Sequence, residues 1–180
     1  MVELPSTVSK IRKNIMSKHH SSAGFTLIEM IVAVAIIIIV TGFAIASFIS
    51  FNDKQQVQTA AREAQLVFRK AQSKARVKEN PTGCTNLEMY RVEKNGGALI
   101  TTAMCVNGGT SQTVEVDRWT IPDGVTLNPG AFTITYKTLH GGAGLPADAD
   151  TYDVTLAGYN NTYTFEITKG GEISTGAFTE

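Results

Sequence analysis

The longest apolar segment of the chain runs from Met30 to Phe51 and contains no charged residue in 22 positions. A helix needs about 20 predominantly apolar residues to cross a lipid bilayer. Many side chains in the first half of the segment are β-branched, which in water favours a strand. In lipid, however, a lone segment can satisfy its own backbone N–H and C=O groups only as a helix. We therefore predict one membrane-spanning helix, with the acidic residue Glu29 at its start.

Charged residues are segregated along the chain, although the formal net charge is zero. The net charge is +3 over residues 1–24, +4 over residues 53–80 and −6 over residues 81–180. Basic residues accumulate on the cytoplasmic side of membrane helices. The first block therefore places the N-terminus in the cytoplasm, and the chain after Phe51 on the other side of the membrane.

A distinctive junction precedes the apolar segment. The stretch Ala23-Gly24-Phe25-Thr26-Leu27-Ile28-Glu29-Met30 follows a basic leader and places an acid four residues after Phe25. It resembles the processing site of type IV prepilins and pseudopilins. The resemblance implies that a prepilin peptidase cleaves between Gly24 and Phe25 and N-methylates the new Phe25 amine. It also implies that Glu29 meets the Phe25 ammonium of a neighbouring subunit and sets the axial register of a filament.

A conventional secretory signal is the alternative for this region. Ala44-Ile45-Ala46 fits the small-residue pattern of a signal peptidase site, which would release a secreted domain after Ala46. A secretory apolar region spans about 7–15 residues and is preceded by basic residues. Here the apolar segment is longer, begins after Glu29 and continues past Ala46, which favours the prepilin interpretation.

The helical pattern continues after the apolar segment. Small and apolar residues recur at helical spacing on one face, namely Val57, Ala60, Ala61, Ala64, Phe68, Ala71 and Ala75. Asn80-Pro81 supplies a stop signal, so we predict a helix from Phe25 to Glu79. The predicted organisation is a cleaved leader (1–24), a transmembrane helix (25–52), an amphipathic stalk (53–80) and a head (81–180).

The head is predicted to be rich in β-structure. Turn residues containing glycine, proline and asparagine separate several short strand-like runs. These runs are Leu87–Val92, Ala98–Val106, Thr113–Asp117, Phe132–Leu139, Val154–Ala157 and Tyr163–Thr168. The expected fold class is α+β, with the long helix packed on an antiparallel sheet or small sandwich.

Cys84 and Cys105 are the two cysteines of the chain. If Glu93-Lys94-Asn95-Gly96 forms a four-residue hairpin loop, Cys84 lies directly opposite Cys105. A compartment outside the cytoplasm permits a disulfide. Two free thiols or a metal site are the alternatives.

An acidic loop is a second candidate for a metal site. Asp148, Asp150 and Asp153 are carboxylate residues of the kind that binds Ca²⁺, and some pseudopilins bind calcium in a late loop. Their spacing matches no fixed motif, so a solvated acidic loop is the alternative, and no other cofactor is expected. The chain has no HExxH motif or nucleophile elbow, and its glycine-rich stretches lack the strand-to-helix context of phosphate loops. We predict that it is not an enzyme.

The resemblance to type IV prepilins implies a structural subunit of a type IV pilus or a type II secretion pseudopilus. The direct passage from helix to β-rich head is most similar to H-type minor pseudopilins and related minor pilins. The resemblance implies prepilin peptidase, other pilins, an inner-membrane assembly platform and the lipid bilayer as partners. A major pilin and a DNA-uptake minor pilin are alternatives, but phosphate binding requires Lys and Arg, and the net charge of the head is −6.

Overall fold

The computed structural model describes residues 24–139 and 141–179. Apart from Gly24, the predicted leader lies outside the described residues. The chain divides into two compact units, Met1–Thr41 and Gly42–Glu180. In the first unit the described chain is the beginning of helix α1 (Leu27–Arg76), and its side chains are exposed.

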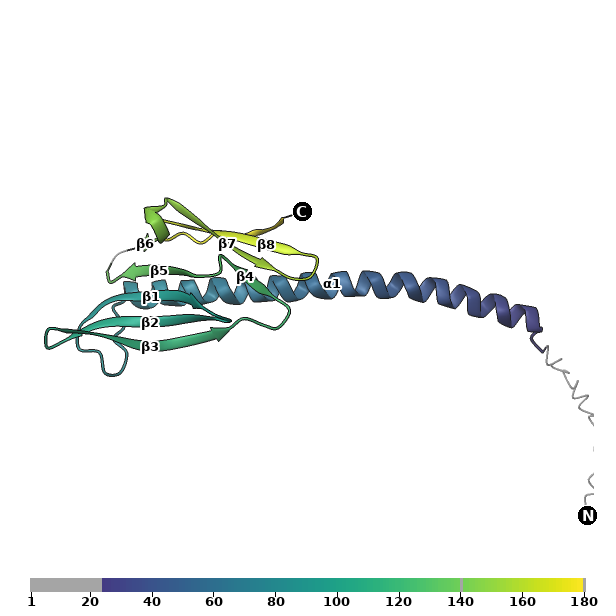
Figure 1. The fold of residues 1–180 in the computed structure, drawn as a ribbon, viewed down its shortest axis with the longest axis horizontal. Coiled ribbons are helices and arrows are strands. Elements are labelled where there is room, and N and C mark those ends of the chain that lie inside the picture. The colour runs from purple at the N-terminus through teal and green to yellow at the C-terminus, as the bar shows by residue number, and fades with distance from the viewer. Residues whose placement is uncertain (1–23, 140, 180) are drawn as a thin grey trace, which may run out of the picture. The chain divides into compact units, whose positions relative to one another are not determined.

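The second unit combines the rest of α1 with two antiparallel sheets, which confirms the predicted α+β class (Figure 1). The strand order is β3-β2-β1-β5-β6 in the first sheet and β4-β7-β8-β9 in the second. The strands are β1 (Leu87–Asn95), β2 (Ala98–Asn107), β3 (Thr110–Thr120), β4 (Thr126–Asn128), β5 (Phe132–Lys137), β6 (Ala143–Gly144), β7 (Thr151–Ala157), β8 (Thr162–Thr168) and β9 (Ala177–Thr179). A short 3-10 helix, η1 (Pro146–Asp148), precedes β7.

The alternating pattern of the sequence predicts six of these strands, and the structure adds β4, β6 and β9. The added strands are two or three residues long, too short to show an alternating pattern. β3 is longer than predicted at both ends because it pairs with β2 along its whole length. β5 ends at Lys137 before its predicted end, and Leu139 has a φ of +60°, which is incompatible with an extended strand.

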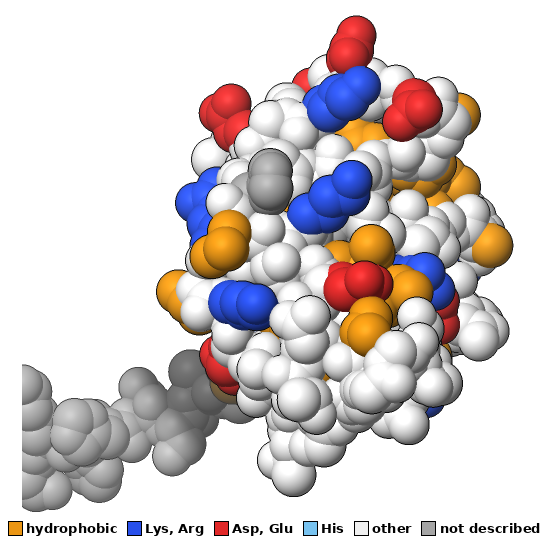
Figure 2. All heavy atoms as spheres, turned by 90° about the vertical axis from the view of Figure 1, so that its left-hand side faces the viewer, with side chains coloured by type: hydrophobic (Ala, Val, Ile, Leu, Met, Phe, Trp, Pro, Cys, Tyr) orange, Lys and Arg blue, Asp and Glu red, His pale blue; other side chains and the backbone are white. Residues whose placement is uncertain are grey.

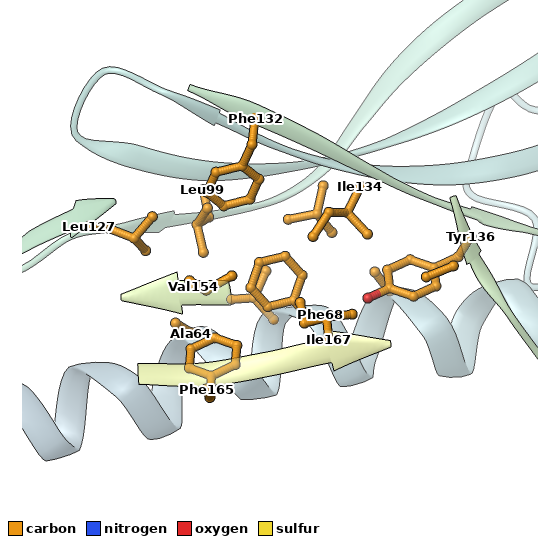
Figure 3. Packing of buried hydrophobic residues seen from close by; sticks show 14 of the residues in the cluster. Ala64, Phe68, Leu99, Leu127, Phe132, Ile134, Tyr136, Val154, Phe165 and Ile167 are labelled. Carbon is orange, nitrogen blue, oxygen red and sulfur yellow. The ribbon is translucent and has the colours of Figure 1, made fainter. Parts of the chain in front are cut away.

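The predicted apolar face of the helix forms one side of the core. Its seven small and apolar residues are fully buried. Phe68 lies at the centre, with ring centroids 6.2 Å from Phe132 of β5 and 6.1 Å from Phe165 of β8. Figure 3 shows these rings between α1 and strands of both sheets. Burying a side chain of this size contributes about 1.5–3 kcal/mol. Because Phe68 packs against strands of both sheets, α1 and the two sheets share one hydrophobic core.

Two buried glutamines of α1 bind the carbonyl groups of neighbouring loops. The Gln65 side chain donates to the Ser174 carbonyl at 3.0 Å, and the Gln72 side chain donates to the Gly171 carbonyl at 2.7 Å. A buried amide without a partner would cost about 1–3 kcal/mol. These hydrogen bonds therefore fix the C-terminal segment against the helix.

The helix ends at Arg76, before the predicted stop at Asn80-Pro81. Lys78 has a left-handed φ of 50°, and its N–H donates to the carbonyl of Ala75 at 3.1 Å. The next N–H, of Glu79, donates to the carbonyl of Lys74 at 3.0 Å. This pair of bonds is the Schellman motif, which satisfies the last carbonyl groups of a helix.

The hairpin between β1 and β2 has a different register from the predicted one. The turn is the two-residue Gly96-Gly97, with a φ of +58° at Gly96. The pairing that follows places Leu87 opposite Cys105, so the predicted four-residue loop with Cys84 directly opposite Cys105 is wrong. Glycine tolerates positive φ, and two-residue turns of this kind match the twist of paired strands.

Cys84 and Cys105 nevertheless form the predicted disulfide, with their Cα atoms 5.5 Å apart. Cys84 lies in the loop before β1, and the side chain of Asn107 holds this loop beside β2. The Asn107 amide donates to the Gly83 carbonyl at 2.8 Å, and its oxygen accepts from the Thr85 N–H at 2.7 Å. The disulfide thus bridges a loop and a strand.

Reduction of this disulfide is expected to lower the free energy of unfolding by about 3 kcal/mol, because the bridge closes a loop over a sequence separation of 21 residues. Urea unfolding of the full chain in detergent, with and without reductant, measures the loss. The double variant Cys84→Ser/Cys105→Ser is the control and should be insensitive to reductant. Alkylation of both thiols in the native, unreduced protein would contradict the prediction.

Candidate processing and assembly site

The predicted cleavage junction lies just before the helix. Thr26 is the N-cap of α1: its hydroxyl oxygen accepts from the Glu29 N–H at 3.3 Å, and its carbonyl accepts from the Met30 N–H at 3.2 Å. Gly24 and Phe25 precede the first helical turn, and the Phe25 side chain is 76% exposed. A peptidase needs an accessible, non-helical segment, and the bond between these two residues lies in one.

Glu29 lies in the first turn of α1. Thr26 and Glu29 have the Thr-x-x-Glu spacing of a capping box, and an acid is favoured at this end by the partial positive charge of the helix. Sequence reasoning missed this cap, although the spacing signals it. Within the described part of the chain, the Glu29 carboxylate is exposed and makes no ion pair. It can therefore accept a cation from outside the chain.

The apolar part of α1 is exposed. α1 is long and apolar enough to cross a membrane. All described side chains from Leu27 to Phe51 are exposed. Burial in lipid would remove this surface from water.

A comparison with protein families decides the nature of this segment. The family model described as the prokaryotic N-terminal methylation motif matches residues 19–45, which include the junction and Glu29. In this segment the chain is type IV pilin-like. Comparison with curated proteins and with solved structures finds no match.

The methylation motif bears on the processing, assembly and membrane anchoring of the chain. It implies processing by a prepilin peptidase and assembly with other pilins, and it belongs to a family of structural proteins. The long apolar helix in the same segment indicates membrane anchoring.

Asp53, two residues after the apolar segment, binds the turn between β7 and β8. Its carboxylate accepts hydrogen bonds from the N–H groups of Tyr159, Asn160 and Asn161 at 2.8–3.0 Å, and from the Asn161 side chain at 2.7 Å. Gly158 precedes this turn, and a Cβ there would lie 2.3 Å from the Asp53 carboxylate. The turn can approach α1 this closely because the residue before it is glycine. No local pattern signals a contact across more than a hundred residues.

The hydrogen bonds of this contact lower the pKa of Asp53. Burial raises the pKa of the carboxyl, but the four hydrogen bonds outweigh burial and bring the pKa below the usual 3.8. A depressed carboxyl pKa contributes stability above the unfolded-state pKa, and this contribution is lost as the pH falls through the folded-state pKa. The attachment of the β7–β8 turn is therefore intact at neutral pH and weakens below about pH 4.

Replacing this carboxylate tests the contact. Asp53→Asn is expected to lower the free energy of unfolding by about 2 kcal/mol at pH 7, because an amide presents its own donors to four N–H groups. Its stability should also vary less between pH 5 and pH 3 than that of the wild type. Denaturant unfolding at both pH values measures the effect. Asp123→Asn is the matched control, because the exposed Asp123 carboxylate accepts no hydrogen bond among the described residues; equal effects of the two substitutions would contradict the prediction.

The structure does not bring the three candidate calcium ligands together. Asp148 ends η1, Asp150 lies in the following loop and Asp153 lies on β7, opposite Glu166 of β8. All three aspartates are exposed. Across residues 24–139 and 141–179, no three His, Cys, Asp or Glu side chains are close enough to hold a metal ion.

Proposed function

We propose that the protein is a structural subunit of a membrane-anchored filament, either a type IV pilus or a type II secretion pseudopilus, and has no catalytic activity. The observation that carries this proposal is the methylation motif at residues 19–45, which includes the beginning of α1. One helix thereby links a peptidase site, an apolar segment and a β-rich head. Polymerisation would proceed through the N-terminal helix.

The proposed topology follows from the charge and hydropathy pattern. Residues 1–24 form a cytoplasmic leader that is removed, residues 25–52 cross the inner membrane, and residues 53–180 lie outside the cytoplasm as stalk and head. The exposed apolar side chains of α1 contact lipid before assembly and neighbouring helices afterwards. Prepilin peptidase, sibling pilins and the inner-membrane assembly platform are the proposed partners.

Within this class we propose a minor subunit, most similar to H-type pseudopilins of type II secretion or to minor pilins. The support is the direct passage from α1 into a β-rich head, with no helix longer than η1 among the described residues after α1. Glu29 favours a position below the tip, because the outermost subunit has no neighbour above it. A major pilin remains the alternative within the same superfamily.

A DNA-uptake role has less support. Binding to phosphates requires clustered basic groups. Figure 2 shows one end of the second unit, where Lys and Arg side chains are interspersed with acidic ones. The face in view offers no continuous basic surface.

Expression of the tagged wild-type chain in a host with a pilus or secretion machine tests the proposal. Intact-mass analysis should give a chain that begins at N-methylated Phe25, and the chain should co-purify with sheared filaments at low stoichiometry. High stoichiometry would identify a major pilin. A mature chain that begins after Ala46 would identify a secreted domain and overturn the proposal.

A further inference from the structure

The turn between β7 and β8 is fixed beside the helix at the end of the apolar segment. Asp53 follows Phe51 by two residues, about 3 Å along a helix axis. The Tyr159 N–H binds the Asp53 carboxylate at 2.8 Å, within the group of four hydrogen bonds described above. The backbone of this turn therefore lies close to the level at which the apolar segment ends.

Tyr159 presents its side chain outward at this position. The side chain is 85% exposed, more than any other exposed large hydrophobic side chain among the described residues. It makes no described ring contact or side-chain hydrogen bond. The core of the second unit therefore does not require this aromatic residue, although its backbone is held firmly in place.

The position of the turn matches the interfacial layer of a bilayer. The hydrocarbon core is about 30 Å thick, and the whole bilayer with its headgroups about 40–45 Å, which leaves about 5–8 Å of headgroup region on each side. If the hydrocarbon ends near Phe51, Asp53 and the turn lie within the headgroup region. Tyrosine is enriched at this depth because its ring is apolar and its hydroxyl is polar.

We propose that Tyr159 is a membrane-interface anchor that rests the base of the second unit on the lipid headgroups before assembly. The exposed cation Lys54 lies next to Asp53 in sequence, and its Nζ lies 4.7 Å from the centre of the Phe178 ring. We assign the surface to lipid and not to a protein pocket because it continues the apolar segment of α1. The inference requires α1 to span a membrane and does not depend on filament assembly.

Tryptophan fluorescence in lipid vesicles tests the proposal on the full-length chain. The native Trp119 is first replaced by phenylalanine, which removes its hydrogen bond to the exposed Glu63. In this background, Tyr159→Trp is reconstituted into phosphatidylethanolamine–phosphatidylglycerol vesicles with or without lipids brominated near the ester group. We expect the tryptophan of this variant to emit at a shorter wavelength than a free indole does in buffer without detergent. We also expect its emission to lose much of its intensity when the lipid is brominated.

Val77→Trp provides the matched control. Val77 follows the end of α1 and is 70% exposed, and it lies 24 residues beyond Asp53. Most of that distance is helical, which corresponds to about 35 Å along the axis. Brominated lipid should not quench tryptophan at this position. Asn160→Trp, in the same turn as Tyr159, should be quenched and serves as a second probe if Tyr159→Trp fails to fold.

The result that overturns the proposal is equal emission of the Tyr159→Trp and Asn160→Trp chains with and without brominated lipid, while alkaline extraction shows that α1 remains inserted. A second result would also overturn the proposal. If brominated lipid does not quench the indole in vesicles, and the indole becomes buried only after other pilins are added, Tyr159 makes a protein contact. The measurement uses unassembled subunits. A failure of filament incorporation therefore leaves it unaffected, and the two proposals are tested separately.

Discussion

Replacement of Glu29 by valine is expected to give a chain that inserts into the membrane and is cleaved, but does not enter filaments. Removing an acid makes the apolar segment cheaper to insert. If Glu29 pairs with the Phe25 ammonium of a neighbouring subunit, as the resemblance to prepilins implies, that ammonium would lose its counter-charge in an apolar environment. Breaking a buried ion pair costs about 3–5 kcal/mol, which corresponds to a loss of about a hundredfold or more in the association constant.

Two further substitutions at Glu29 separate the effect of its charge from that of its length. The Glu29 N–H donates to the Thr26 hydroxyl, and either Glu or Gln can complete a capping box from this position. Glu29→Gln therefore keeps the cap and removes the charge, whereas Glu29→Asp keeps the charge and shortens its reach. We expect the Gln variant to fail as the Val variant does, and the Asp variant to be intermediate.

Membrane abundance, cleavage and incorporation must be measured separately for each variant. Normal incorporation of both the Val and the Gln variants would leave Glu29 as a boundary residue without a role in assembly. Normal incorporation of the Gln variant alone would show that a polar side chain of this length is sufficient and that the charge of Glu29 has no role in assembly.

Substitution of Gly24 by leucine is expected to abolish cleavage and, with it, assembly. Apart from its chain neighbours, no heavy atom of the described residues lies within 4 Å of a Cβ built at Gly24, and Gly24 precedes the first helical residue. A side chain that begins at this position therefore meets no obstacle in the described fold. We attribute the expected loss of processing to the peptidase, whose site we propose has no room for a side chain at Gly24.

Gly42→Leu is the matched control for this variant. A Cβ at Gly42 also meets no side chain of the described residues within 4 Å, and the residue lies in the apolar segment away from the junction. N-terminal sequencing should show uncut Gly24→Leu protein and Gly42→Leu protein that begins at Phe25. Efficient cleavage of the Gly24→Leu chain at the same bond would contradict the proposed role of Gly24.

Local pattern in the sequence was sufficient for the helix, its buried face and its exposed apolar segment. Each rests on spacing that a short window contains: 22 uncharged positions from Met30 to Phe51, and the helical spacing from Val57 to Ala75. Six strands were predictable for the same reason, since alternation and turn residues are local signals. The methylation motif is likewise a contiguous stretch, so the pilin-like assignment could be made before the structure.

The tertiary structure alone decided how distant segments meet. The division into two sheets, the register that places Leu87 opposite Cys105, and the attachment of the β7–β8 turn to Asp53 all join segments far apart in sequence. The disulfide partners were predictable because the chain has two cysteines, but the hairpin register was not, because a glycine pair allows several turns of different length. Contacts of this kind depend on competition among many pairings of similar local quality, and packing against the shared core around Phe68 selects one of them.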